Sequence, residues 1–244
     1  MRVLSLLAVL SIACGGSVAS SEFDPGHFQD PGTKAPTPSN PNPNPQGAPY
    51  PTTNLGYVAN TRIPNLKFTG FRATDTSTMV DNKGDTTVLS MSDYYDPLGN
   101  RGIRLVHLSV NTRWCSPSSQ QVSWFSGFDY ESNKRTGPGL AATLAPDGVL
   151  FVDVLVDGFS PGTPATLDDL RGWVDDHQIN FDTAIDSHYT ELGSLFPQAA
   201  IPFNVTIDAR SMAILETSMG FGTNVEDTLR KWLQWQSINP PMAN

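Results

Sequence analysis

The sequence predicts a single α/β domain, with a central mixed sheet and helices on both faces. Residues 103–110 and 149–156 are almost continuously apolar, as is typical of buried strands. A helix predicted between them requires a crossover connection, which makes the two strands parallel. A hairpin predicted near the C-terminal end adds antiparallel strands, so the sheet is mixed.

The composition is that of a globular protein. The 244 residues are 39% hydrophobic and 16% charged, enough for one sizeable domain or two small ones. The net charge is −9 and the 15 Lys and Arg are scattered, so the chain lacks the basic footprint of a nucleic-acid-binding protein. Two cysteines exclude a disulfide scaffold and a Cys-rich metal site, and the four histidines have no ligand-like spacing. We therefore expect no metal, no cofactor and no nucleic acid.

The first residues predict export. Residues 1–13 have the layout of a signal peptide, with Arg2 before an apolar run too short to span a bilayer. Residues 11–17 resemble the lipobox of bacterial lipoproteins, although Ser11 stands where that motif prefers Leu. The resemblance implies cleavage before Cys14 and its lipidation, which anchors the protein to a membrane in the periplasm or at the cell surface. Alternatively, an ordinary signal peptidase cuts after residues 17–19 and the protein is secreted. Both outcomes remove the Cys14 thiol, so the mature chain keeps Cys115 alone and we expect no intramolecular disulfide.

Residues 14–56 predict a Pro/Asn-rich disordered linker. Nine of the 20 prolines lie between Asp24 and Pro51, with almost nothing apolar to bury. In an extended polyproline form this stretch reaches about 90 Å, which suits a stalk between an anchor and a domain. The alternative is a disordered leader without a role. The folded domain is expected over residues 57–238, followed by a short tail over 239–244.

The first half of the domain begins with an N-terminal β-hairpin extension. Residues 66–71 and 86–91 predict short strands on either side of the turn-rich segment 81–85. Residues 103–110 form the first buried strand, and residues 116–126 predict a helix with Pro117 tolerated in its first turn.

The second half alternates in the same way. Residues 149–156 form the second buried strand, and Thr166 opens a helix with a capping-box-like start. Residues 203–208 alternate as a strand does, and residues 212–217 return as its hairpin partner. A closing helix is expected where Val225, Leu229, Trp232 and Leu233 form an apolar stripe.

Cys115 lies where the first buried strand ends and the first helix begins. The free amides and the positive dipole end of a helix N-terminus favour an anion, which lowers the pKa of a thiol placed there. Position alone therefore makes Cys115 a candidate nucleophile.

The chain resembles the thioredoxin superfamily, and most closely the extracytoplasmic redoxins of the TlpA and peroxiredoxin-like group. The resemblance extends from about residue 63 to residue 233. It depends on Trp114-Cys115-Ser116-Pro117-Ser118 after the first buried strand, on residues 152–157 in the second, and on Ile201-Pro202 before the late strand. It implies that Ile201 and a cis Pro202 present backbone to a substrate, that Trp114 forms one wall, and that the partners are a protein thiol or disulfide and an external thiol reductant.

Two departures from the family pattern define the predicted chemistry. Ser118 occupies the position of the second, resolving cysteine, so the ordinary dithiol cycle is not available to the monomer. Ser109 stands where thioredoxins place a buried acid, and Arg113 is a candidate source of compensating positive charge. We therefore expect an exported thiol-dependent oxidoreductase that acts through Cys115 alone, on protein disulfides or sulfenic acids.

Two alternatives remain. In a one-cysteine peroxidase, a threonine three residues before the cysteine helps to bind peroxide, and Thr112 matches that position. However, Leu108 replaces the proline of the peroxidase motif, and no counterpart of its arginine is found. The other alternative is a non-catalytic, tethered binding module, in which Cys115 is a buried, unreactive side chain.

Overall fold

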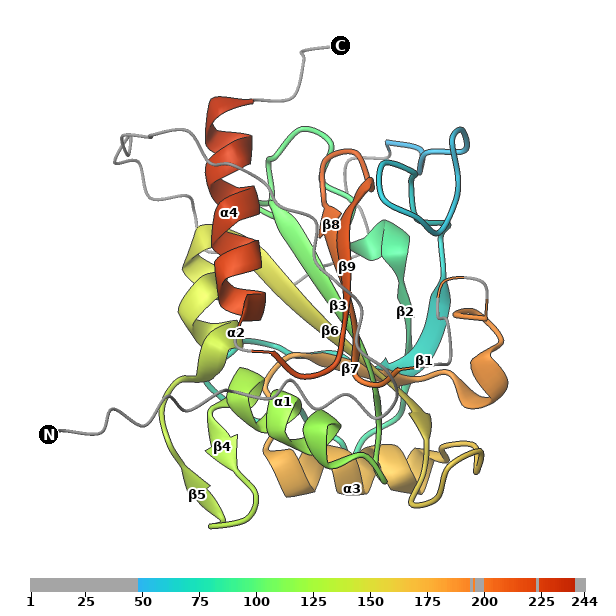
Figure 1. Ribbon diagram of the computed structural model, residues 1–244, viewed down its shortest axis with the longest axis vertical. Coiled ribbons are helices and arrows are strands. Elements are labelled where there is room, and N and C mark those ends of the chain that lie inside the picture. The colour runs from blue at the N-terminus through green and yellow to red at the C-terminus, as the bar shows by residue number, and fades with distance from the viewer. Residues whose placement is uncertain (1–47, 194, 196–199, 223, 240–244) are drawn as a thin grey trace, which may run out of the picture.

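The computed structural model describes residues 48–193, 195, 200–222 and 224–239. The predicted signal peptide, Cys14 and most of the predicted linker therefore lie outside the described residues. A seven-stranded mixed sheet, in the order β2-β1-β7-β6-β3-β8-β9, forms the centre of the domain (Figure 1). Its strands are β1 (Lys67–Phe71), β2 (Thr87–Ser90), β3 (Leu105–Thr112), β6 (Val149–Asp157), β7 (Asp182–Ile185), β8 (Phe203–Asp208) and β9 (Ile214–Met219).

The central pairing agrees with the sequence prediction. β3 pairs in parallel with β6 and antiparallel with β8, and β8 forms a hairpin with β9. β3 begins and ends two residues later than predicted, at Leu105 and Thr112. The described residues form four α-helices: α1 (Ser116–Ser126), α2 (Gly139–Leu144), α3 (Leu167–His177) and α4 (Asn224–Ile238). The bounds of α1 are those predicted, and Thr166 caps α3 with a reciprocal capping box.

Several elements were not predicted. β7 joins the N-terminal hairpin to the sheet, because it pairs in parallel with β6 and antiparallel with β1. The two strands approach closely at Gly70, where a Cβ atom would lie 2.1 Å from the carbonyl oxygen of Thr183. A side chain at position 70 would therefore force the strands apart. A small separate hairpin, β4 (Phe128–Asp129) and β5 (Lys134–Arg135), follows α1 and leads into α2.

The sheet separates two apolar clusters. All four α-helices contribute buried residues to one cluster, and they lie on one side of the strands in Figure 1. The other cluster contains no residue of α1 to α4. The sequence predicted helices on both faces of the sheet. On this second face, the 3₁₀ helix η1 (Met91–Asp93) and loop residues such as Ile63 and Leu192 cover the strands. Tyr189, from the 3₁₀ helix η3 (Ser187–Tyr189), packs against the same cluster.

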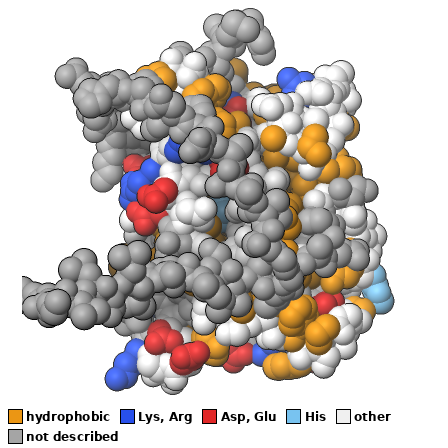
Figure 2. Space-filling model, in the orientation of Figure 1, with side chains coloured by type: hydrophobic (Ala, Val, Ile, Leu, Met, Phe, Trp, Pro, Cys, Tyr) orange, Lys and Arg blue, Asp and Glu red, His pale blue; other side chains and the backbone are white. Residues whose placement is uncertain are grey.

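Charged side chains of both signs lie in small mixed groups on the face shown in Figure 2, with apolar patches between them. Among the described residues, no helix is long and apolar enough to cross a membrane.

Candidate active site

Cys115 lies at the junction of β3 and α1. It is the N-cap residue of α1 in an extended conformation, with φ −95° and ψ 110°. Its carbonyl oxygen accepts hydrogen bonds from the amides of Ser118 at 3.0 Å and Ser119 at 3.2 Å, which start the helix. Pro117, within the first turn, needs no intrahelical hydrogen bond for its nitrogen and suits this position. The sequence thus places the sulfur at the beginning of α1, as predicted.

The second part of the site comes from the loop before β8. The Ile201–Pro202 peptide bond is cis, as the resemblance implies. The carbonyl oxygen of Ile201 lies 3.6 Å from the Sγ atom of Cys115, although 86 positions separate them along the chain. The structure therefore brings together Cys115, Ile201 and Pro202, three of the residues that the sequence singled out.

The sulfur is neither exposed nor a free thiol. Cys115 is 1% exposed, and the structure records it as disulfide-bonded, so no cysteine of the described chain is free. The sequence predicts no intramolecular disulfide in the mature chain, because processing removes the Cys14 thiol. The structure is that of the unprocessed, 244-residue chain. The other half of the disulfide lies outside the described residues.

Trp114 is held beside the sulfur by a carboxylate. Its indole Nε1 donates to Asp157 Oδ2 at 3.1 Å, and the amide of Gly162 donates to the same oxygen at 2.9 Å. The hydroxyl of Tyr189 donates to Asp157 Oδ1 at 3.1 Å. Burial, and then the Asp157 carboxylate, raise the pKa of Tyr189 to about 12, so its hydroxyl keeps the proton that it donates. Asp157 therefore links Trp114, the residue before Cys115, to the segments that contain Gly162 and Tyr189.

Ser118, at the position of a resolving cysteine, faces the interior. It is fully buried, and its hydroxyl makes no hydrogen bond within the part of the chain that the structure describes. A buried hydroxyl without a partner is costly, because it has lost its hydrogen bonds to water. The residue therefore occupies an apolar-like position on the inner side of α1.

The two residues considered for peroxide or charge chemistry are placed differently. Thr112 is fully buried, and its Oγ1 atom has no hydrogen-bond partner among the described residues. Arg113 points toward α3, where it donates to the carbonyl oxygen of Asp169 at 3.0 Å and pairs with Asp176. Its guanidinium also lies 4.1 Å from the ring centroid of Phe159. These contacts hold the guanidinium of Arg113 against α3, whereas the sequence made it a candidate source of positive charge for the sulfur.

A buried acid lies one strand away from Ser109. Asp153 of β6 is the register partner of Ser109 in β3, and it accepts hydrogen bonds from Ser109 Oγ at 3.0 Å and Asn111 Nδ2 at 2.6 Å. The indole Nε1 of Trp173 in α3 donates to the other carboxylate oxygen at 2.8 Å. Burial raises the pKa of Asp153, and its hydrogen-bond donors oppose that rise. A buried carboxylate therefore lies beside Ser109, on the neighbouring strand.

A pair of amides joins α1 to β8. Gln121 Nε2 donates to Asn204 Oδ1 at 3.0 Å, and Asn204 Nδ2 donates to Gln121 Oε1 at 3.1 Å. Both side chains are buried. The helix that begins at the sulfur is therefore bound by two hydrogen bonds to the strand that follows Pro202.

Sequence reasoning missed Asp157, Tyr189 and Asp153 as residues of the site. Asp157 had a detectable signal, since it ends a predicted strand parallel to β3 and the carboxyl ends of parallel strands meet at one edge. Identifying Asp153 required the β3–β6 register, and identifying Tyr189 required the path of the loop after β7. The local sequence shows neither.

Comparisons with known proteins establish the fold. No family model and no curated protein matches the sequence. Among solved structures, one from Chlorobium tepidum, assigned as the thiol:disulfide interchange protein DsbE, is similar with a TM-score of 0.50 and 18% identity, over 73% of this chain and 96% of that chain. A secreted thiol-disulfide isomerase from Corynebacterium glutamicum has a TM-score of 0.47 and 18% identity, over 78% and 92% of the two chains. AhpC from Mycobacterium tuberculosis has a TM-score of 0.49 and 14% identity, over 77% and 98%. This protein has a thioredoxin-like fold.

Proposed function

We propose that the protein is a thiol-dependent redox protein in which reduced Cys115 exchanges with disulfides or sulfenic acids of partner proteins. The observation that carries the proposal is the 3.6 Å approach of Cys115 Sγ to the carbonyl of Ile201, next to a cis proline and at the start of α1. A helix N-terminus favours the thiolate, and an extended backbone beside it suits a substrate strand. The solved structures of similar fold include proteins described as thiol:disulfide exchange proteins.

A chain lipidated at Cys14 has no second thiol to pair with Cys115. In the full-length chain the reaction begins with reduction, since the structure records Cys115 in a disulfide. Two equivalents of an external thiol open that bond and are themselves oxidised to a disulfide. The released Cys115 thiolate then attacks one sulfur of a partner disulfide, and the other partner sulfur leaves as a thiolate and takes up a proton. With a sulfenic acid instead, the Cys115 thiol condenses to the same mixed disulfide and one water is released.

The absence of a second cysteine at position 118 determines how the mixed disulfide is resolved. A hydroxyl cannot displace a thiolate from a disulfide, so Ser118 cannot release the partner. In the processed chain, which has lost the Cys14 thiol, the external thiol must attack instead, so the mixed disulfide is long-lived when the reductant is withdrawn. This behaviour distinguishes the proposed mechanism from that of a dithiol protein.

We also propose that the protein works outside the cytoplasm, anchored through a lipid on Cys14. The signal-like residues 1–13 and the lipobox-like residues 11–17 support this location. Mass spectrometry of the N-terminal peptide from a membrane fraction tests it. A diacylglyceryl mass on Cys14 supports the anchor, and an N-terminus after residue 19 contradicts it.

The test of the chemistry uses the protein reduced with a phosphine, which is then removed, and a dye-labelled peptide disulfide as the probe. We expect a covalent adduct of the protein with one half of the peptide, formed at Cys115. Cys115→Ala should abolish the adduct, whereas Cys14→Ser should leave its rate unchanged. Ser118→Cys should form the adduct and then release the peptide without added thiol.

Three outcomes contradict the proposal. An adduct that forms at the same rate in Cys115→Ala would show that another group reacts. A native, reduced protein whose Cys115 neither forms the adduct nor reacts with an alkylating reagent would instead identify a binding module with an inert sulfur. Faster consumption of hydrogen peroxide than of the peptide disulfide would favour the peroxidase alternative.

A further inference from the structure

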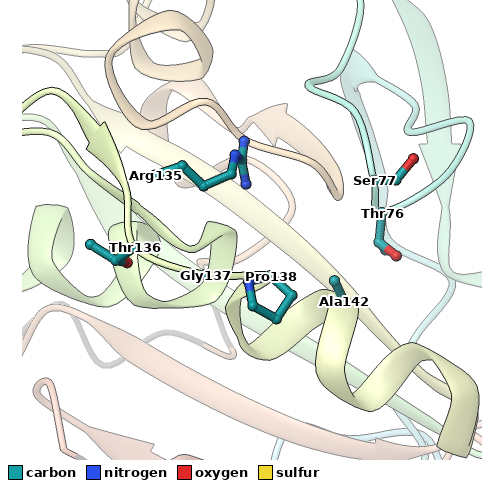
Figure 3. A pocket seen from close by; sticks show the side chains of 7 residues that line it. All are labelled: Thr76, Ser77, Arg135, Thr136, Gly137, Pro138 and Ala142. Carbon is teal, nitrogen blue, oxygen red and sulfur yellow. The ribbon is translucent and has the colours of Figure 1, made fainter.

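An open pocket of about 530 Å³ lies at the opposite end of α1 from the sulfur. It is lined by residues of the loop after β1 and of the β5–α2 connection, namely Thr76, Ser77, Arg135, Thr136, Gly137, Pro138 and Ala142 (Figure 3). Its volume is within the range of small-molecule sites. Because α1 has 11 residues at a rise of about 1.5 Å each, its two ends lie about 16 Å apart. The pocket is therefore separate from the candidate active site.

Arg135 supplies a positive charge to this pocket. Its Nη1 atom donates to the carbonyl oxygen of Ser126, the last residue of α1, at 3.0 Å. That bond fixes the guanidinium while the remaining N–H groups stay available, and Figure 3 shows the side chain extending from β5 into the space opposite Ser77. Within the described chain, Arg135 makes no ion pair with a carboxylate. In a protein of net charge −9, this is an uncompensated cation held at the edge of a concave site.

The rest of the lining complements a small organic acid. The hydroxyl of Thr76 makes no hydrogen bond among the described residues, while the carbonyl of Thr76 is fixed by Asn180 Nδ2 at 2.7 Å. Pro138 and Ala142 provide an apolar side (Figure 3). The carboxylate of Asp75 does not line the pocket, and it accepts hydrogen bonds from Ser77 N and Oγ within its own loop.

We propose that this pocket binds a small organic carboxylate. The guanidinium of Arg135 and the hydroxyl of Thr76 would donate to the carboxylate, and the hydrocarbon part would lie against Pro138 and Ala142. A planar guanidinium matches a carboxylate with two parallel hydrogen bonds, which a neutral amide does not reproduce. The proposal does not depend on the chemistry at Cys115.

The experiment is a titration of ¹⁵N-labelled full chain with benzoate, followed by amide chemical shifts. We expect saturable shifts at Thr76, Ser77, Thr136 and Gly137. Benzamide, the neutral analogue, should bind at least about fivefold more weakly, because it loses the charge-assisted hydrogen bonds. Inorganic phosphate serves as a competitor without a hydrocarbon part.

Three variants test the assignment. Arg135→Gln should weaken benzoate by about tenfold, whereas Lys134→Gln, which removes the adjacent cation that does not line the pocket, should not. Gly137→Leu provides a blocking variant that does not depend on Arg135. A Cβ atom on Gly137 would meet nothing within 4 Å, and Gly137 lines the pocket, so we expect the added side chain to take up part of its space.

The proposal is overturned if benzoate causes no saturable shifts, or if Arg135→Gln and Gly137→Leu bind it as tightly as the parent chain. Binding of phosphate without binding of benzoate would also overturn the assignment to an organic acid. Thermal unfolding of each variant confirms that a loss of binding does not arise from a loss of fold.

Discussion

The indole of Trp114 and the carboxylate of Asp157 are joined by a hydrogen bond of 3.1 Å, across the ends of two parallel strands. The same carboxylate also accepts from Tyr189 and Gly162, so three segments depend on one side chain. Asp157 is therefore a positioning residue for the wall beside the sulfur.

Asp157→Ala removes the acceptor for all three donors. We expect a loss of about 1.5 kcal/mol in the free energy of unfolding, because the partly buried Trp114 indole and Tyr189 hydroxyl lose their acceptor. If the proposed function holds, the rate of adduct formation with the peptide disulfide should fall by about tenfold. Tyr189→Phe removes one donor and should have a smaller effect on both. Asp168→Ala is the matched control, since that side chain is 95% exposed. Unchanged Trp114 fluorescence and an unchanged rate in Asp157→Ala would refute the positioning role.

Ser118→Ala should stabilise the protein. Its buried hydroxyl has no partner in the described chain, so its removal recovers about 1 kcal/mol in the free energy of unfolding. Urea denaturation measures the change, and Ser116→Ala, at an exposed position of the same helical turn, is the control. A loss of stability as large as the expected gain would mean that the hydroxyl makes a hydrogen bond in solution.

Acid should weaken the fold through two buried histidines. Burial lowers the pKa of His107 to about 4, and burial together with Arg113 lowers that of His177 to about 3. An unfolded histidine titrates near pH 6.5, so below that pH the unfolded chain binds protons that the folded protein does not. Stability is therefore greatest above pH 6.5 and falls as the pH decreases toward 4.

His107→Phe isolates one of these contributions. The ring of His107 packs against those of Phe125 and Phe151, at centroid distances of 5.4 and 5.1 Å, so an aromatic replacement suits the site. Between pH 6.5 and pH 4, the free energy of unfolding of the variant should fall by about 3 kcal/mol less than that of the parent protein, at about 1.4 kcal/mol per pH unit. Urea denaturation of both proteins across this range measures the difference. Parallel stability profiles would show that His107 does not titrate as described.

Gln121 and Asn204 should behave as a coupled pair. Gln121→Leu alone leaves a buried amide without its partner and should cost about 2 kcal/mol, and so should Asn204→Val. The double variant replaces both partners by apolar groups and should cost clearly less than the two single changes together. Denaturation of the four proteins gives the coupling free energy. Strict additivity would contradict a direct interaction.

The elements around the sulfur could be predicted because their signals are local. β3 and β6 are marked by continuous apolar residues, and α1 by Pro117 in its first turn. β7 could not be predicted in this way, because it has only four residues and begins with Asp182. That carboxylate is stabilised in the interior by residues about a hundred positions away: Tyr94 Oη and Ala73 N each donate to it at 2.7 Å, and Arg72 pairs with it at 3.5 Å.

The same distinction holds for the site. Cys115 and Pro202 were found from short motifs, and the structure places Cys115 beside Ile201, the residue before that proline. Sequence predicted a missing acid from Ser109 alone, whereas Asp153 supplies a carboxylate through cross-strand register. Ser118 was singled out as a departure from the pattern that the chain resembles, but its complete burial depends on how α1 packs against the sheet.

The approach of Cys115 to Ile201 has a consequence for biosynthesis. The two residues are separated by 86 positions, and β8 must pair with β3 before the carbonyl reaches the sulfur. A chain that emerges from its N-terminus presents Cys115 long before Ile201 is available, and contacts between distant positions form slowly. The sulfur of a growing chain therefore passes through an interval in which the loop that buries it in the native domain is not yet in place. If the protein is exported as proposed, oxidants and folding helpers outside the cytoplasm meet Cys115 before the domain is complete.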